Sequence, residues 1–106
     1  MPYNKVSYDP PRAHVAYSAI SITVSGGAVD YSLKDNTLLF NKVNQGREVV
    51  VRNTYPVLLK LNDTNNDAIE LYSYEGISTS GIPISDILIT TTASGSNIRV
   101  WILGWN

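Results

Sequence analysis

The chain of 106 residues contains no cysteine, which excludes both a disulfide framework and a thiolate metal site. Its one histidine, His14, follows a pair of prolines, a poor setting for the base of a catalytic triad. A single histidine without cysteine also disfavours a zinc site. The sequence therefore predicts no catalytic residue, no metal ligand and no cofactor, and we expect a protein that is not an enzyme.

Charge is also scarce. Charged residues make up 16% of the chain, the formal net charge is −1, and like charges form no run. Proteins that bind a phosphate backbone or an anionic membrane usually carry a basic patch. The apolar runs are too short to span a bilayer, and the first residues contain no apolar segment of signal-peptide length. We expect a soluble protein made in a cytoplasm, with neither nucleic acid nor membrane as a partner.

The residues that are abundant favour β-structure. Serine, threonine and asparagine dominate the polar fraction, and many apolar residues are β-branched. No window shows the period of an amphipathic helix, so almost no helix is expected. Alternating apolar residues instead predict about eight short strands at a spacing of about ten residues, the pattern of an all-β sandwich or barrel.

Residues 48–61 are the clearest of these segments. They predict a hairpin, with one strand, a short turn at 53–56 and a second strand. Val49 and Val51 share one face of the first strand, and Leu59 lies on the apolar face of the second. Because a lone hairpin is only marginally stable in water, other strands must cover these apolar faces.

Further strands are expected along the rest of the chain. The alternations that predict them span 20–25, 29–33, 38–43, 69–71, 82–89 and 98–102. Gly26-Gly27 predicts a tight hairpin, and 72–81 a longer connection. The three-residue step from Ile84 to Ile87 predicts a bulge or a corner between two strands. The expected fold is all-β: an antiparallel two-sheet β-sandwich, of jelly-roll type, because stacked sheets hide their strand edges.

The N-terminal residues 1–17 predict an extended arm in front of a β-sandwich domain formed by 18–106. Prolines interrupt the arm, and the pair Pro10-Pro11 cannot lie inside a sheet. The arm is either a draped terminus or a docking segment, since tyrosine offers a large contact area at low entropic cost. The candidate partner-binding residues of the arm are Tyr3, Tyr8, Pro10, Pro11, Arg12 and Tyr17.

Two tryptophans near the C-terminus are the remaining candidates for partner binding. Trp101 lies on the face of its strand opposite Val100 and Ile102, so that this strand is apolar on both faces. Such a strand is either central in the sandwich or covered by another subunit, and both possibilities are open for Trp101. Trp105 caps the core or anchors an interface, where tryptophan is enriched.

Residues 63–67 place oxygen-bearing side chains at alternate positions, as calcium loops do. However, Ala68 stands where an EF-hand loop needs glycine, and Tyr74 where it needs a bidentate glutamate. A β-turn loop, in which Asp and Asn bind their own backbone, is the favoured interpretation.

Four segments carry a resemblance to a known class of protein, namely 49–54, 59–62, 81–90 and 98–100. In these strands and turns the chain resembles the head-decoration or cement proteins of tailed bacteriophages and related virion appendage domains. The resemblance implies a β-sandwich, often trimeric, that lies on the outside of a capsid and clamps capsomers together. It implies no active site.

We therefore expect a non-enzymatic virion structural protein, a capsid decoration protein made in the host cytoplasm and located on the capsid surface. It would self-associate, with a homotrimer favoured, and its arm would contact the major capsid protein. The alternative is a glycan-binding module of a tail fibre or baseplate, in which exposed tryptophan and tyrosine side chains stack on sugar rings.

Overall fold

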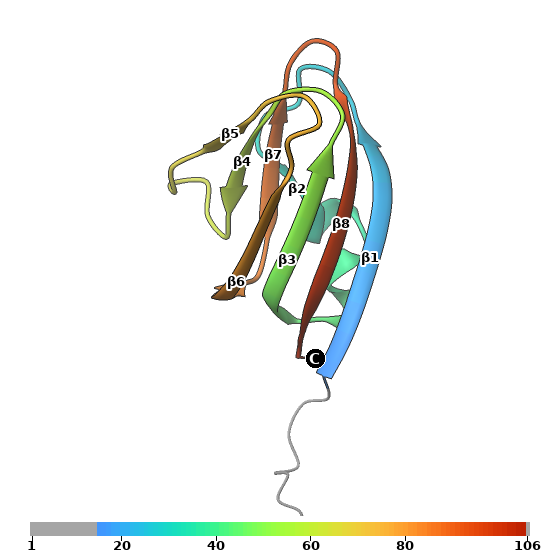
Figure 1. Ribbon diagram of the computed structural model, residues 1–106, viewed down its shortest axis with the longest axis vertical. Helices are drawn as coiled ribbons and strands as arrows, with labels where there is room; N and C mark the ends of the chain where they lie inside the picture. The colour runs from blue at the N-terminus through green and yellow to red at the C-terminus, as the bar shows by residue number, and fades with distance from the viewer. Residues whose placement is uncertain (1–14, 106) are drawn as a thin grey trace, which may run out of the picture.

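The computed structural model describes residues 15–105, which form two four-stranded antiparallel sheets packed face to face (Figure 1). The long sheet has the strand order β1-β8-β3-β6, and the short sheet has the order β2-β7-β4-β5. The long-sheet strands are β1 (Val15–Val24), β8 (Ser96–Trp105), β3 (Gln45–Asn53) and β6 (Ile77–Ile84). The short-sheet strands are β2 (Tyr31–Ser32), β7 (Ile87–Thr91), β4 (Val57–Leu61) and β5 (Ile69–Leu71). The predicted eight-stranded antiparallel sandwich is confirmed.

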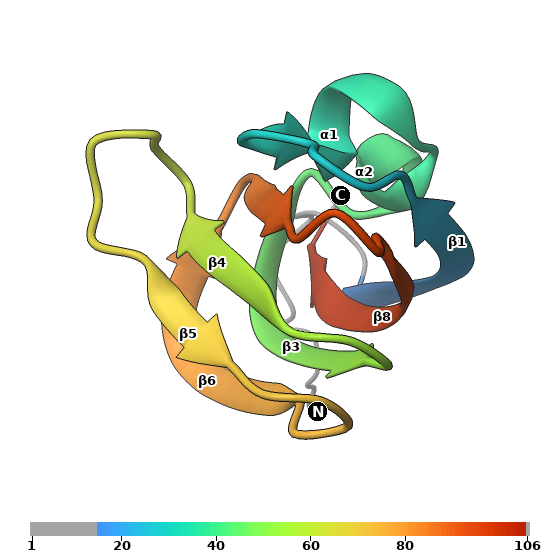
Figure 2. The same ribbon diagram turned by 90° about the horizontal axis from the view of Figure 1, so that it is seen from above.

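The core lies between the two sheets, and strand alternation determines which side chains enter it. Burial along β8 alternates at every position, because successive side chains of a strand point to opposite faces. The fully buried residues include Val100 of the long sheet and Leu59 and Ile89 of the short sheet. Seen from above, the sheets curve around this core (Figure 2).

Strand β1 begins at Val15, so it includes the last residues of the stretch expected to be an arm. Its first residues pair with the end of β8, with Val15 opposite Trp105 and Tyr17 opposite Leu103. The remainder of the expected arm, with His14, lies outside the described residues.

The segment 48–61 forms two strands with the predicted faces, but the predicted hairpin pairing is wrong. Strand β3 pairs with β6 and β8, whereas β4 pairs with β5 and β7 in the other sheet. The turn after Asn53 therefore carries the chain from one sheet to the other. The buried faces of β3 and β4 meet across the core, and this arrangement buries more of their apolar surface than an isolated hairpin would.

The hairpin predicted at Gly26-Gly27 is also wrong, because this turn crosses between the sheets. Strand β2 pairs with β7 rather than with β1. Three hydrogen bonds direct the chain toward β7: Gly27 N donates to Thr92 O (2.9 Å), Ala28 N to Thr91 Oγ1 (3.0 Å), and Thr91 N to Ala28 O (3.0 Å).

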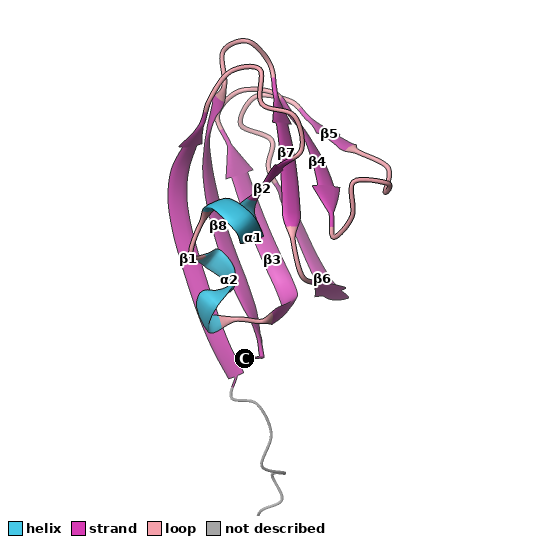
Figure 3. Cartoon of the chain, turned by 180° about the vertical axis from the view of Figure 1, so that it is seen from behind, coloured by secondary structure: helices cyan, strands magenta, loops and turns pink. Residues whose placement is uncertain are grey.

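The strand predicted at 38–43 is replaced by a short helix. Two helices of one turn each, α1 (Leu33–Asn36) and α2 (Leu39–Lys42), follow β2 (Figure 3). Ser32 Oγ caps α1 by accepting a hydrogen bond from Asp35 N at 3.1 Å. Leu39 and Val43 are fully buried at a four-residue spacing that fits one helical face, and α2 packs against β1.

The connection predicted at 72–81 is shorter than expected, because β6 begins at Ile77 as an edge strand. Ile82 was expected in the core, yet half of its surface is exposed. The predicted corner between Ile84 and Ile87 is confirmed: β6 ends at the first residue, and β7 begins at the second in the opposite sheet.

Candidate functional site

The outer face of the long sheet carries the side chains that the core does not use. Strand β8 lies in the middle of this sheet, between β1 and β3, and no described element covers its outer face. The exposed members of β8, in order, are Asn97, Arg99, Trp101, Leu103 and Trp105. Large apolar side chains at such positions are unusual on a monomer surface when they lie side by side.

The lower part of this face, near the end of β8, is apolar, and we call it the aromatic face. It comprises Tyr17, Val50, Trp101, Leu103 and Trp105. Cross-strand register places Tyr17 beside Leu103 and Val50 beside Trp101. Trp101, Leu103 and Trp105 each expose between 37% and 39% of their surface, and Tyr17 exposes 70%. Trp101 is therefore not a core residue, and both tryptophans lie at the surface of the described chain.

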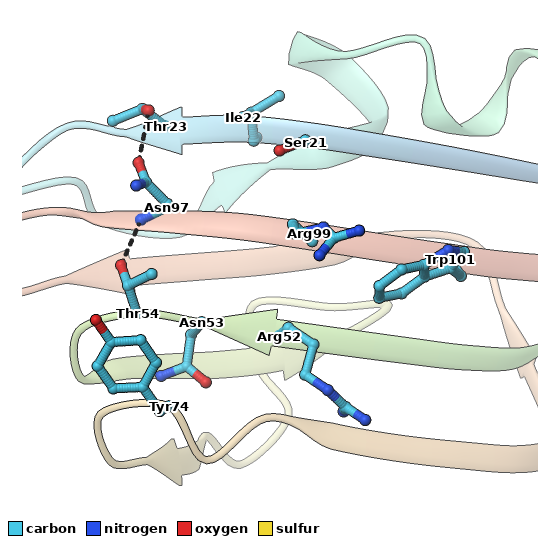
Figure 4. A pocket seen from close by; sticks show the side chains of 10 residues that line it. All are labelled: Ser21, Ile22, Thr23, Arg52, Asn53, Thr54, Tyr74, Asn97, Arg99 and Trp101. Atoms are coloured by element: carbon cyan, nitrogen blue, oxygen red, sulfur yellow. Dashed lines mark hydrogen bonds between the residues drawn. The ribbon is translucent and has the colours of Figure 1, made fainter.

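The upper part of the same face is hollowed into a groove with a volume of about 660 Å³, which we call the arginine groove (Figure 4). Its lining comes from β1, β3, β8, the turn between β3 and β4, and the loop between β5 and β6. Its polar, charged and aromatic lining residues include Thr23, Arg52, Thr54, Tyr74, Asn97 and Arg99, with Trp101 at the border of the aromatic face.

Two arginines lie on neighbouring strands in the arginine groove. Arg52 of β3 and Arg99 of β8 are direct cross-strand partners. The guanidinium carbon of Arg99 lies 4.8 Å from the centroid of the Trp101 ring, a cation–π geometry. Within residues 15–105, the one ion pair joins Lys60 to Asp30, at 3.3 Å, so neither arginine faces a carboxylate there.

A row of polar side chains crosses the end of the groove. Thr23 Oγ1 donates to Asn97 Oδ1 at 2.8 Å, and Asn97 N donates to Thr54 Oγ1 at 3.0 Å (Figure 4). The Asn97 amide group thus has its oxygen engaged, while its Nδ2 donates to no protein atom of the described residues. This row can offer donors and acceptors to a polar ligand.

Asn53 holds the loop that contributes Tyr74 to the groove. Its buried side chain donates from Nδ2 to the carbonyl oxygens of Tyr55 and Tyr72, both at 2.8 Å. Its Oδ1 accepts from Gly76 N at 2.8 Å. These bonds fix both ends of the turn in which Tyr74 adopts a φ of 58°.

The structure brings together three of the residues that the sequence singled out. Tyr17, Trp101 and Trp105 lie on the aromatic face. The other candidates lie outside the described residues: Tyr3, Tyr8, Pro10, Pro11 and Arg12. Sequence reasoning missed the arginine groove, since the sequence shows that Arg99 and Trp101 share one strand face but not that Arg99 pairs with Arg52.

The loop at 63–67 binds its own backbone, as the β-turn interpretation predicts. Asp63 Oδ1 accepts from Asn65 N at 2.9 Å, and Asn66 Nδ2 donates to Leu61 O at 2.7 Å. In the described part of the chain, no three His, Asp or Glu side chains gather as a potential metal site. No helix among residues 15–105 has the length and apolar character needed to cross a membrane.

Comparison of the chain with protein-family models, with curated proteins and with solved structures found no match in any of the three.

Proposed function

We propose that this chain is a jelly-roll virion structural protein that decorates a capsid and self-associates through its aromatic face. The pairing pattern supports the jelly roll. The first strand pairs with the last, β2 with β7, β3 with β6, and β4 with β5, all antiparallel. Alternate pairs fall in opposite sheets, as they do when one long two-stranded ribbon rolls up into two Greek keys.

The observation that carries the proposed self-association is the uncovered aromatic face. Two tryptophans, a tyrosine, a leucine and a valine lie on one face of the long sheet, next to the exposed Glu48, which is opposite Leu103 beside a register shift of β3. The exposed parts of these side chains, 37% of each tryptophan and 70% of Tyr17, remain available to a partner, and tryptophan and tyrosine are among the residues most enriched in binding hot spots. Copies of the chain related by a rotation axis can all turn this surface toward the axis, so that each copy buries it against its neighbours.

A decoration protein needs many weak contacts repeated by symmetry rather than one strong contact. Self-association of a small sandwich supplies such contacts, and avidity multiplies them on a capsid lattice. In this proposal the N-terminal residues add a second contact, to the major capsid protein. Val15, the first described residue, pairs with Trp105 of the aromatic face.

The test has two parts, one for assembly and one for location. Sedimentation of the purified chain should show a species heavier than the 11.7 kDa monomer, with a trimer favoured. Immunogold labelling of purified virus particles from the source culture should place the protein on the head surface. Labelling confined to tails, or found only off the particles, would contradict the decoration role while leaving the self-association to stand on its own.

A further inference from the structure

The arginine groove contains two cations that the described part of the protein does not neutralise. Like charges directly opposite each other on neighbouring strands are destabilising, yet Arg52 and Arg99 occupy one cross-strand pair. Glu48, on the same strand as Arg52, is opposite Leu103 and not Arg99. An anion bound in the groove would reduce this repulsion and make charge-assisted hydrogen bonds with a guanidinium group.

Both arginines are placed by the fold and not merely exposed on it. The ring of Trp101 holds the Arg99 guanidinium from one side. Gly76 leaves room for Arg52: a Cβ at this glycine would lie 3.0 Å from Arg52 Nη1 and 2.7 Å from Val51 O. A planar guanidinium recognises a carboxylate through two parallel hydrogen bonds, and the only described partner of Arg52 is a long 3.5 Å contact to Val51 O.

The remainder of the groove is suited to hydroxyl groups. Asn97 Nδ2 is a donor without a protein partner among residues 15–105, and the hydroxyls of Thr23 and Thr54 flank it. Across from the threonines, Tyr74 exposes about three quarters of its surface and presents an aromatic ring to the groove (Figure 4). A sugar can contact both kinds of group, because its hydroxyls form hydrogen bonds with amides and its ring face packs on an aromatic side chain.

We propose that the arginine groove binds a saccharide that carries a carboxylate. Arg52 and Arg99 attract the carboxylate into the groove that both line, and the sugar hydroxyls face the row of Thr23, Asn97 and Thr54. The groove volume of about 660 Å³ falls within the usual range of small-ligand sites, about 300–1,000 Å³. The groove shares Trp101 with the aromatic face, whereas Arg52, Thr54 and Asn97 line the groove alone. Variants of Arg52 therefore test sugar binding without changing a residue of the proposed assembly surface.

A nucleic acid is a poorer match to this groove. A protein that binds a phosphate backbone usually contacts it with several cations spread over its surface. This groove has two arginines in one cross-strand pair, and the chain has a net charge of −1. The other occupant to consider is an acidic side chain of a second copy of this chain, and the experiment separates it from a saccharide.

The experiment titrates the full chain with two acidic sugars and their neutral counterparts, followed by calorimetry and by amide chemical shifts. Sialyllactose is compared with lactose, and digalacturonate with α-1,4-linked digalactose; sodium acetate serves as the carboxylate without a sugar. We expect at least one acidic sugar to bind, with shifts at Arg52, Asn97 and Arg99, and the neutral sugars and acetate to bind at least about tenfold more weakly.

Two variants and one control locate the binding. Arg52→Gln and Arg99→Gln should each weaken the acidic sugar at least about tenfold. Arg47→Gln changes an exposed arginine of the same strand that does not line the groove, and it should bind as the unaltered chain does. Arg52→Gln has no stacked ring to disturb, so it remains informative if Arg99→Gln unfolds.

Three results would overturn the proposal. One is the absence of binding to both acidic sugars at millimolar concentration. Another is equal binding of neutral sugars or acetate. The third is loss of self-association in Arg52→Gln without any change in sugar binding, which would assign the arginines to a contact between copies.

Discussion

Replacing Asn53 by alanine should destabilise the protein strongly, although Asn53 is a single small polar residue. The side chain is 3% exposed and makes three hydrogen bonds of 2.8 Å, two donated to carbonyls and one accepted from Gly76 N. Each intramolecular hydrogen bond contributes about 1 kcal/mol net, and more where the partner left behind is shielded from water. We therefore expect Asn53→Ala to lower the free energy of unfolding by about 3 kcal/mol.

Urea unfolding followed by far-UV circular dichroism measures this loss, with the m-value checking that the unfolded states are comparable. For a domain of this size a 3 kcal/mol loss lowers Tm by more than about 10 °C. Asn41→Ala is the matched control, because Asn41 is exposed in α2 and its side chain makes no hydrogen bond within the described residues. A change of less than about 1 kcal/mol for Asn53→Ala, or an equal change in both variants, would refute the reasoning.

Two further predictions concern the core and the surface charges. Leu59→Ala should lower the free energy of unfolding by about 2–5 kcal/mol because Leu59 is fully buried. Leu58→Ala on the same strand should lower it by well under half of that, since Leu58 is 41% exposed. Equal losses in urea unfolding would contradict the assigned faces of β4. Lys60→Gln should change the free energy of unfolding by less than about 1 kcal/mol, because its ion pair with Asp30 is partly exposed and screened by salt. A larger loss that persists in 1 M NaCl would contradict this, because it would show that the pair stabilises the fold more than its exposure indicates.

Strand faces could be predicted from the sequence because alternation is a local property. Val49, Val51, Leu59, Val100 and Trp101 all point to the side that their positions indicate. The partner of each strand could not be predicted in the same way. The Asn53 turn and the Gly26-Gly27 turn look like hairpin turns, but in a sandwich such turns also serve as crossings between sheets.

Short helices and polar edge strands were the other misjudged elements. Leu38 and Phe40 fit alternating strand positions, but the residues that the core buries fully are Leu39 and Val43, which lie one helical turn apart. The Ser32 cap belongs to α1, the helix just before them. The first half of β6 alternates serine and threonine with few apolar residues, so it resembles a loop until its pairing with β3 is known. The arginine groove could not be predicted either, since Arg52 and Arg99 are distant in sequence and only the cross-strand register brings them together.

The central claim is that the aromatic face is an interface between copies of this chain, and sedimentation equilibrium of two proteins tests it most directly. The unaltered chain should give a mass that is an integral multiple of 11.7 kDa, three times that mass being favoured. The double variant Trp101→Ser and Leu103→Ser, with both changes on exposed positions, should sediment as a folded monomer. A monomer for the unaltered chain at all concentrations, or an oligomer unaffected by the double variant, would contradict the claim.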